Sequence, residues 1–139
     1  MNTIASHAPA SGEISSRAHW TGLVMSGLVI AFLLFDSVIK LVPLSIVTET
    51  MAELGYPPGL ERGLGVLTLV CVLLYAVPRT AVLGAILLTG LFGGAMATHL
   101  RIGSPLFSHL LFGLYLGLMV WGGLYLRDAR LRALIPFRL

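Results

Sequence analysis

Charged residues are scarce in this chain of 139 residues. Only 11% of them are Asp, Glu, Lys or Arg, whereas 57% are hydrophobic and the mean hydropathy is +0.94. A soluble domain usually carries about 25% charged residues. A soluble fold this poor in charge would lack the polar side chains needed to cover its surface. The composition therefore excludes an ordinary soluble domain and predicts a chain that folds in lipid.

Cysteine and catalytic motifs are also nearly missing. Cys71 is the only thiol, which excludes a disulfide framework or a CxxC redox pair within one chain, and we interpret it as a small apolar filler. The sequence has no phosphate-binding loop, no nucleophile motif and no pair of catalytic carboxylates. No second ligand follows His99 at helical spacing, so we expect no metal site. A nucleic-acid partner has no support, and we assign no catalytic residue.

What the chain has instead is four long apolar runs. A helix needs roughly 20 apolar residues to cross a bilayer, and in hydrocarbon every backbone N–H and C=O must be paired within the element. We therefore predict an all-α polytopic membrane protein, an antiparallel bundle of four transmembrane helices. The short turns "PRT" and "RIGSP" make the second, third and fourth helices successive neighbours. The predicted spans are about 20–39, 60–77, 80–100 and 105–126.

Polar sequence is confined to the chain ends and to the link between the first two runs. Residues 1–18 lack the early basic cluster of a signal peptide, so we expect a disordered cytoplasmic tail before a transmembrane domain at 19–127. Residues 128–139 are a predicted basic tail, held by anionic lipid headgroups. Residues 45–54 carry apolar positions at helical spacing and end at Gly55, which predicts a short amphipathic helix on the outer surface.

The distribution of basic residues predicts the orientation. Four spans place both termini on one side, which would hold six arginines, whereas the other side holds only Lys40, Arg62 and Arg101. Cytoplasmic loops of membrane proteins carry an excess of Lys and Arg. We therefore expect a multi-pass protein with both termini in the cytoplasm.

Small residues recur four positions apart in most of the runs. Lipid tails are as apolar as leucine, so membrane helices associate through close packing at small side chains. We predict helix packing at such positions, against a neighbouring helix, a second copy or another membrane protein. The pairs are Gly90 with Gly94, Gly113 with Gly117, and Gly22 with Ser26.

Ionisable residues near the spans gather at the predicted outer face. A lone carboxylate in hydrocarbon must be paired, protonated or directed into a polar cavity, and Asp36 and Lys40, four apart on a helix, can pair. Two interpretations stay open: an ion pair that closes the bundle, or a ligand or proton site with Asp36, Lys40 and His99 as its polar walls. The full candidate cluster is Asp36, Lys40, Glu61, Arg62, His99, Arg101 and His109.

Several segments resemble those of the DoxX-like family of small four-helix membrane proteins. The most specific are "PRTAVLGA" from residue 78, "ATHLR" from residue 97 and "LRDARLRALIP" from residue 126, and the resemblance covers about residues 22–136. It implies a four-helix bundle in the cytoplasmic (inner) membrane of a bacterium. The family name comes from a distant relative linked to thiosulfate oxidation with quinone. Family members often carry a glutamate roughly where Thr68 stands here, so the resemblance implies no proton chemistry of that carboxylate for this chain.

Three functions compete at this point. Exposed small-residue strips and the shortage of catalytic groups favour an accessory or binding bundle that acts with a membrane-protein partner or as a homo-oligomer. The polar cluster and the quinone-linked relative favour, as an alternative, a quinone- or lipophile-binding protein without a covalently bound cofactor. A small-solute transporter is the second alternative, although broken helices at the midplane are not evident.

Overall fold

A computed structural model of the chain describes residues 14–42 and 44–135. The described ranges contain helices and no strand, so the predicted all-α class is confirmed. In chain order the elements are α1 (Ser16–Leu41), α2 (Ser45–Glu53), α3 (Leu60–Ala76), α4 (Ala81–Arg101), the π-helical turn η1 (Leu106–Leu110), α5 (Phe112–Arg127) and α6 (Ala129–Leu134).

Three of these stretches are long and apolar enough, by length and composition, to cross a membrane. They are α1, α4 and the stretch that η1 and α5 form together. Helix α3 has 17 residues, which makes it about 25 Å long against a bilayer core of about 30 Å. Its role as a fourth span stays a prediction.

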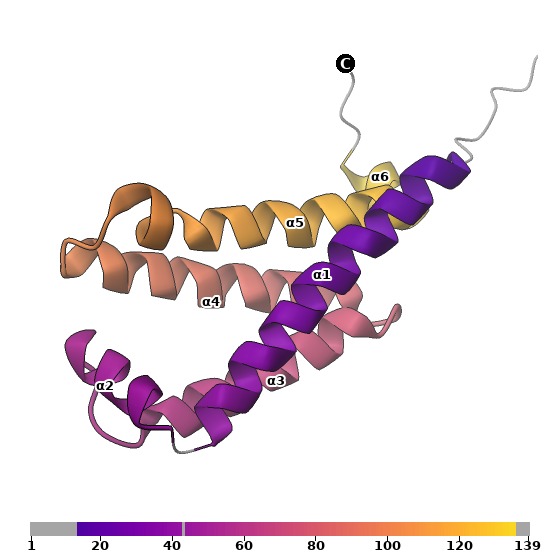
Figure 1. Ribbon diagram of the computed structural model, residues 1–139. Coiled ribbons are helices and arrows are strands. Elements are labelled where there is room, and N and C mark those ends of the chain that lie inside the picture. The colour runs from indigo at the N-terminus through magenta and orange to yellow at the C-terminus, as the bar shows by residue number, and fades with distance from the viewer. Residues whose placement is uncertain (1–13, 43, 136–139) are drawn as a thin grey trace, which may run out of the picture.

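The four long helices form a ring in which each contacts two neighbours. Helix α1 packs against α3 and α5, and α4 packs against the same two helices (Figure 1). We call the end at which α5 runs into α6 the α6 end, and the opposite end the α2 end. Figure 1 shows α1 and α3 diverging from α4 and α5 toward the α2 end, where α2 lies across the resulting gap. The bundle is therefore closed at one end and spread at the other.

Close backbone contacts hold the α6 end together. A Cβ added at Gly84 of α4 would lie 2.3 Å from the backbone nitrogen of Tyr75 in α3. A Cβ at Gly123 of α5 would lie 2.6 Å from Oγ of Ser26 in α1, and one at Gly22 would lie 2.8 Å from the Gly123 carbonyl. No side chain fits at these points, so glycine allows the helices to meet at backbone distance.

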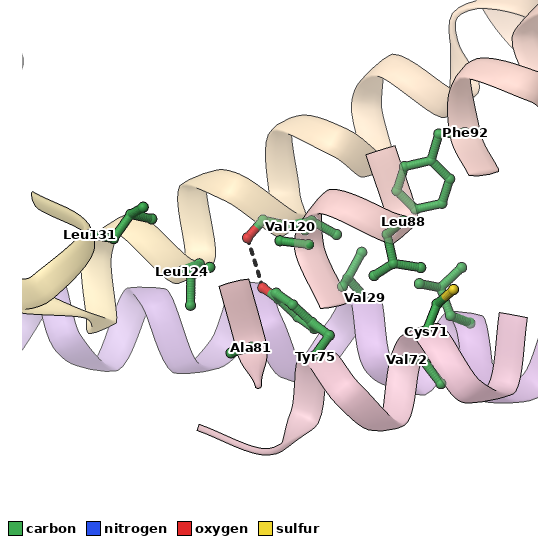
Figure 2. Packing of buried hydrophobic residues seen from close by; sticks show 12 residues of the cluster. Val29, Cys71, Val72, Tyr75, Ala81, Leu88, Phe92, Val120, Leu124 and Leu131 are labelled. Carbon is green, nitrogen blue, oxygen red and sulfur yellow. Dashed lines mark hydrogen bonds between the residues drawn. The ribbon is translucent and has the colours of Figure 1, made fainter. Parts of the chain in front are cut away.

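Buried apolar side chains fill the space between these crossings. All four helices contribute to the cluster, for example through Val29, Val72, Leu88 and Val120 (Figure 2). Each of these four side chains is essentially inaccessible to solvent. The core thus occupies the half of the bundle nearer the α6 end.

At the α2 end, glycines join the helices only in two separate pairs. A Cβ at Gly65 of α3 would lie 3.1 Å from the Ser37 carbonyl of α1, and a Cβ at Gly113 of α5 would lie 3.1 Å from the Phe92 carbonyl of α4. Gly117 is in ordinary contact with the Phe92 ring, at 3.9 Å. Because α1 stays with α3 and α4 stays with α5, the two pairs can separate from each other.

Gly90 and Gly94 do not pack against another described helix of this chain, so their predicted packing against a second copy or another protein stays a prediction. A Cβ added at either position would have no neighbour within 4 Å, so neither glycine packs against another helix of the chain. Both face the gap between the helix pairs. Spacing four apart marks one face of a helix, but it does not tell which face meets a neighbour.

The helical region extends further than predicted at both ends. Helix α1 begins at Ser16, where Oγ of Ser15 accepts the Ala18 N–H as a cap, so residues 16–18 of the predicted tail are helical. Residues 1–13 and 136–139 lie outside the described ranges. Helix α6 follows Asp128 and buries Leu131 against the core, so much of the predicted basic tail is part of the fold.

Two tyrosines in the apolar helices differ in burial. Tyr75 of α3 is fully buried, whereas Tyr115 of α5 has 41% of its surface exposed. Tyr75 finds buried hydrogen-bond partners near the core, which removes the need for an interfacial position.

Two glycine-to-alanine substitutions on α4 test the close approach at the α6 end. We expect Gly84→Ala to lower the free energy of unfolding by about 1–3 kcal/mol, because the added methyl group must push α3 away. The control Gly90→Ala should be neutral or stabilising by about 0.5–1 kcal/mol, since alanine favours helix and open space surrounds the position. Thermal unfolding in detergent measures both, and equal effects would contradict the packing described.

Candidate ligand-binding site

The gap between the helix pairs is a large cavity of about 870 Å³. Its deep wall is apolar and is formed where the core ends, by Leu33 on α1, Cys71 on α3 and Phe92 on α4. Toward the α2 end the rings of Phe32 on α1 and Phe112 on α5 still meet edge to face, with centroids 5.5 Å apart, and both line the cavity. The cavity nevertheless occupies the gap that the divergence of the helix pairs leaves.

The cavity opens sideways between α3 and α4. Leu67 of α3 and Leu87 of α4 both line it, and they are 48% and 41% exposed. Gly90 and Gly94, next along the same wall, add no side chain that would close the gap. The opening is thus bordered by apolar groups, which suits access from hydrocarbon rather than from water.

Helix α2 covers the end of the cavity. Val47, Met51 and Leu54 line the cavity from this helix and its C-terminal cap, and Met51 is buried. Gly55 ends the helix with a positive φ of 80°, as the sequence predicted, and the Tyr56 N–H returns to the Met51 carbonyl at 2.9 Å. This turn directs the chain back toward α4.

Two side-chain contacts tie this segment to α4. The Thr98 hydroxyl donates to the Gly94 carbonyl at 3.0 Å, so its single proton is used and the Tyr56 hydroxyl, 2.6 Å away, must be the donor to Thr98. Arg101 donates to the Leu54 carbonyl at 2.7 Å, at the C-terminus of α2. Arg101 does not line the cavity, so its contact is structural.

The predicted ion pair of Asp36 and Lys40 is present on the α1 wall. The Lys40 ammonium contacts the Asp36 carboxylate one helical turn away, and both side chains are about one-quarter exposed. Both residues line the cavity. Each charge is thus neutralised by its neighbour while the pair still faces the cavity.

Two histidines lie together on the opposite wall. The rings of His99 and His109 meet edge to face with centroids 5.7 Å apart. Nδ1 of His99 hydrogen-bonds Oγ of Ser104 at 2.9 Å, and Nδ1 of His109 bonds Oγ of Ser108 at 2.7 Å. Each ring therefore keeps Nε2 for a ligand. Residues 14–42 and 44–135 bring no three His, Cys, Asp or Glu together as a metal site would require.

A π-helical turn brings His109 to the cavity. The sequence predicted one continuous helix from residue 105, but the Leu110 and Leu111 N–H groups reach back five residues, to the carbonyls of Pro105 and Leu106. Such a widened turn shifts the direction in which its side chains project. His109 consequently lines the same cavity as His99 although it belongs to another segment.

The predicted polar cluster therefore divides. Asp36, Lys40, His99 and His109 line the cavity, whereas Glu61, Arg62 and Arg101 do not. Glu61 is buried and its carboxylate accepts the Gly59 N–H at 3.0 Å, so it caps the start of α3.

Thr68 stands in the cavity wall on α3. Its side chain is buried, and its hydroxyl donates to the Leu64 carbonyl of its own helix at 2.8 Å. A threonine bonded in this way offers neither a charge nor a transferable proton. The charged groups of this cavity consequently stand near its α2 end.

Sequence reasoning missed the buried polar contact that joins three helices beneath the cavity. The Tyr75 hydroxyl donates to the Val120 carbonyl at 2.7 Å (Figure 2). It also lies 3.0 Å from Oγ of Ser26, which must then donate to it. The available signal was a tyrosine inside an apolar run, since a buried phenol requires a partner. Tyr56 and Thr98 were missed because their contact depends on the path of the loop after α2.

The comparisons with known proteins identify a family. The model of the DoxX-like family matches residues 24–123. The chain belongs to the DoxX-like family. No curated protein and no solved structure matches it. The matched range runs from α1 into α5 and so includes every helix that lines the cavity; the family and the apolar helices together make this DoxX-like chain a membrane protein.

The tie between Tyr56 and Thr98 can be tested by removing one hydroxyl. We expect Tyr56→Phe to speed amide hydrogen exchange in residues 50–56 about five-fold, because a hydrogen bond is worth about 1 kcal/mol. Tyr115→Phe is the matched control, since Tyr115 is exposed on α5. Unchanged exchange in Tyr56→Phe would show that the hydroxyl pair does not hold the segment.

Proposed function

We propose that this DoxX-like protein binds an amphipathic lipophile in the cavity at the α2 end. The apolar part of the ligand lies between the helix pairs, and its oxygen-bearing head lies near His99 and His109. The observation that carries the proposal is the combination of an apolar wall, a sideways opening, and charged residues and histidines at one end only. The geometry thus favours the lipophile hypothesis over the accessory bundle, which the sequence alone put first.

The size and chemistry of the cavity suit such a ligand. Ligand sites usually measure about 300–1,000 Å³ and are mostly apolar with a few polar groups that fix orientation. A volume of about 870 Å³ is at the large end of that range. An isoprenoid quinone has a polar and an apolar part, as the cavity does, because its ring carbonyls accept hydrogen bonds and its tail is hydrocarbon. The Nε2 atoms of the two histidines are the available partners for the head.

The proposal assigns binding rather than catalysis to this chain. A quinone held here would exchange electrons only with a redox centre that another protein supplies. The proposal therefore keeps part of the accessory role, because the protein would present the bound ligand to a membrane partner.

The location is also proposed. We place the protein in the bacterial cytoplasmic membrane with α3 as a fourth span, α2 at the outer surface and the α6 end in the cytoplasm. Charge supports this orientation, because the described part of the α6 end carries five arginines and one aspartate. The described part of the α2 end carries three basic and four acidic residues. The excess of basic residues belongs on the cytoplasmic side.

A second candidate function, docking of a partner helix, is favoured by a different face of α4. Gly93 and Ala97 are exposed, do not line the cavity, and lie four residues apart. A Cβ at Gly93 would meet nothing within 4 Å, so a second backbone could approach there.

Adjacent glycines allow a matched test of the two candidates. We expect Gly94→Phe to weaken binding of a short-chain ubiquinone about ten-fold or more, or by about 1.4 kcal/mol, because the new ring occupies the cavity. Gly93→Phe carries the same change on the outer face and should leave quinone binding unaltered. Titration of detergent-solubilised protein by native mass spectrometry measures both.

The outcomes separate the two functions. Equal binding by wild type and Gly94→Phe would contradict the cavity proposal. Loss of a crosslinked membrane partner in cells expressing Gly93→Phe, but not Gly94→Phe, would support partner docking at the outer face.

Orientation is tested by cysteine labelling in a Cys71→Ser background. Ile102→Cys at the α2 end should react with an impermeant maleimide added to intact spheroplasts, and Arg130→Cys at the α6 end should react only after lysis. Both expectations follow from the proposed orientation, in which the arginine-rich α6 end lies on the cytoplasmic side. The opposite labelling pattern would invert the orientation.

A further inference from the structure

A second hollow lies at the α6 end and, unlike the mostly apolar ligand cavity, is rich in arginine. It measures about 360 Å³ and lies where the start of α1, the turn between α3 and α4, and the junction of α5 with α6 meet. Its charged and titratable lining residues are His19, Arg79, Arg127, Asp128 and Arg130. Three arginines, one from the turn between α3 and α4 and two from the junction of α5 with α6, thus surround one hollow, which we call the basic pocket.

Among residues 14–42 and 44–135, no acidic side chain forms an ion pair with these arginines. Within the described ranges, neither the Arg79 nor the Arg130 side chain forms a hydrogen bond or an ion pair. The ion pair of the described residues joins Lys40 to Asp36, at the α2 end. Asp128 is the one acid on the wall, and its Oδ1 accepts the Arg130 backbone N–H at 2.9 Å as the cap of α6. The pocket therefore has an excess of positive charge.

Arg127 is held in place while its guanidinium stays incompletely bonded. It lies 5.2 Å from the centre of the Tyr75 ring and donates to the Tyr75 carbonyl at 3.4 Å. Its Nε is buried without a hydrogen-bond partner among the described residues. A buried donor without a partner is unfavourable, and an anion beside the guanidinium offsets that penalty electrostatically.

The rest of the lining is apolar and borders the bilayer. Leu23 of α1 and Leu124 of α5 line the same pocket, and Leu23 is partly exposed on the outside of the bundle. Arginines next to apolar groups at the end of membrane helices match a lipid, which joins a phosphate to acyl chains.

We propose that the basic pocket binds the phosphate of an anionic membrane lipid. Arg79, Arg127 and Arg130 contact the phosphate oxygens, and the acyl chains pass Leu23 toward the bilayer. The site is independent of the ligand proposed for the α2 end, because the two hollows lie at opposite ends of the bundle and share no lining residue.

Lipid exchange in detergent tests this site. Delipidated wild-type protein should retain one phosphatidylglycerol per chain in preference to phosphatidylcholine when both are added, as read by native mass spectrometry. Arg79→Gln and Arg130→Gln should each weaken phosphatidylglycerol binding about five-fold, since a basic residue near an anionic lipid is worth about 1 kcal/mol. Both side chains are exposed, so the substitutions spare the core.

The control variant is Arg17→Gln, which removes the same charge from the same end but outside the pocket. It should leave the lipid preference unchanged. A loss equal to that in Arg79→Gln, or no preference for phosphatidylglycerol in wild type, would overturn the site. Inorganic phosphate should not displace the lipid, and displacement at equal concentration would assign the pocket to free phosphate and overturn the lipid assignment.

Discussion

At the α6 end, α4 lies so close to α3 that no side chain fits at Gly84, and no side chain fits at Gly123, where α5 meets α1. Once the helices are fixed at this distance, their inclination decides how far apart they are at the other end. The buried Tyr75 hydroxyl links α1, α3 and α5 at the same level. The cavity, its opening and the position of α2 all depend on this one crossing region.

The two ends of the bundle therefore differ in how their apolar helix faces are covered. At the α6 end the helices bury their apolar faces against each other and leave arginines around a small hollow. At the α2 end the apolar faces remain unpaired, and a short helix covers them through contacts of Tyr56 and Arg101 with α4 and α2. A lipophile in the cavity and an anionic lipid at the basic pocket are the partners that these two surfaces favour.

The sequence was informative wherever a property depends on the neighbouring residues alone. The apolar runs predicted the helices to within a few residues, Gly55 predicted the end of α2, and Asp36 predicted its pairing with Lys40. Properties that depend on the angle between helices were not predictable. Gly84 and Gly123 belong to no pair spaced four apart, yet they mark the tightest contacts.

Only part of the predicted polar cluster lines the cavity, and the reason is again the arrangement of the helices in space. Charge density predicted that ionisable groups gather at one end, but only the fold shows that His109 faces the cavity and Glu61 caps a helix. The position of His109 also depends on a π turn, which periodicity averaged over a long apolar run does not reveal.

The sideways opening between Leu67 and Leu87 determines how the affinity of the cavity for a ligand has to be defined. A cavity that faces hydrocarbon is filled by acyl chains before any ligand arrives, and those chains are as apolar as the wall that they touch. Binding of the proposed lipophile would therefore exchange one membrane component for another, and its constant would be set by mole fraction within the bilayer rather than by concentration in water. Selectivity would then come from the few polar atoms at the head of the ligand, because the hydrocarbon contacts nearly cancel.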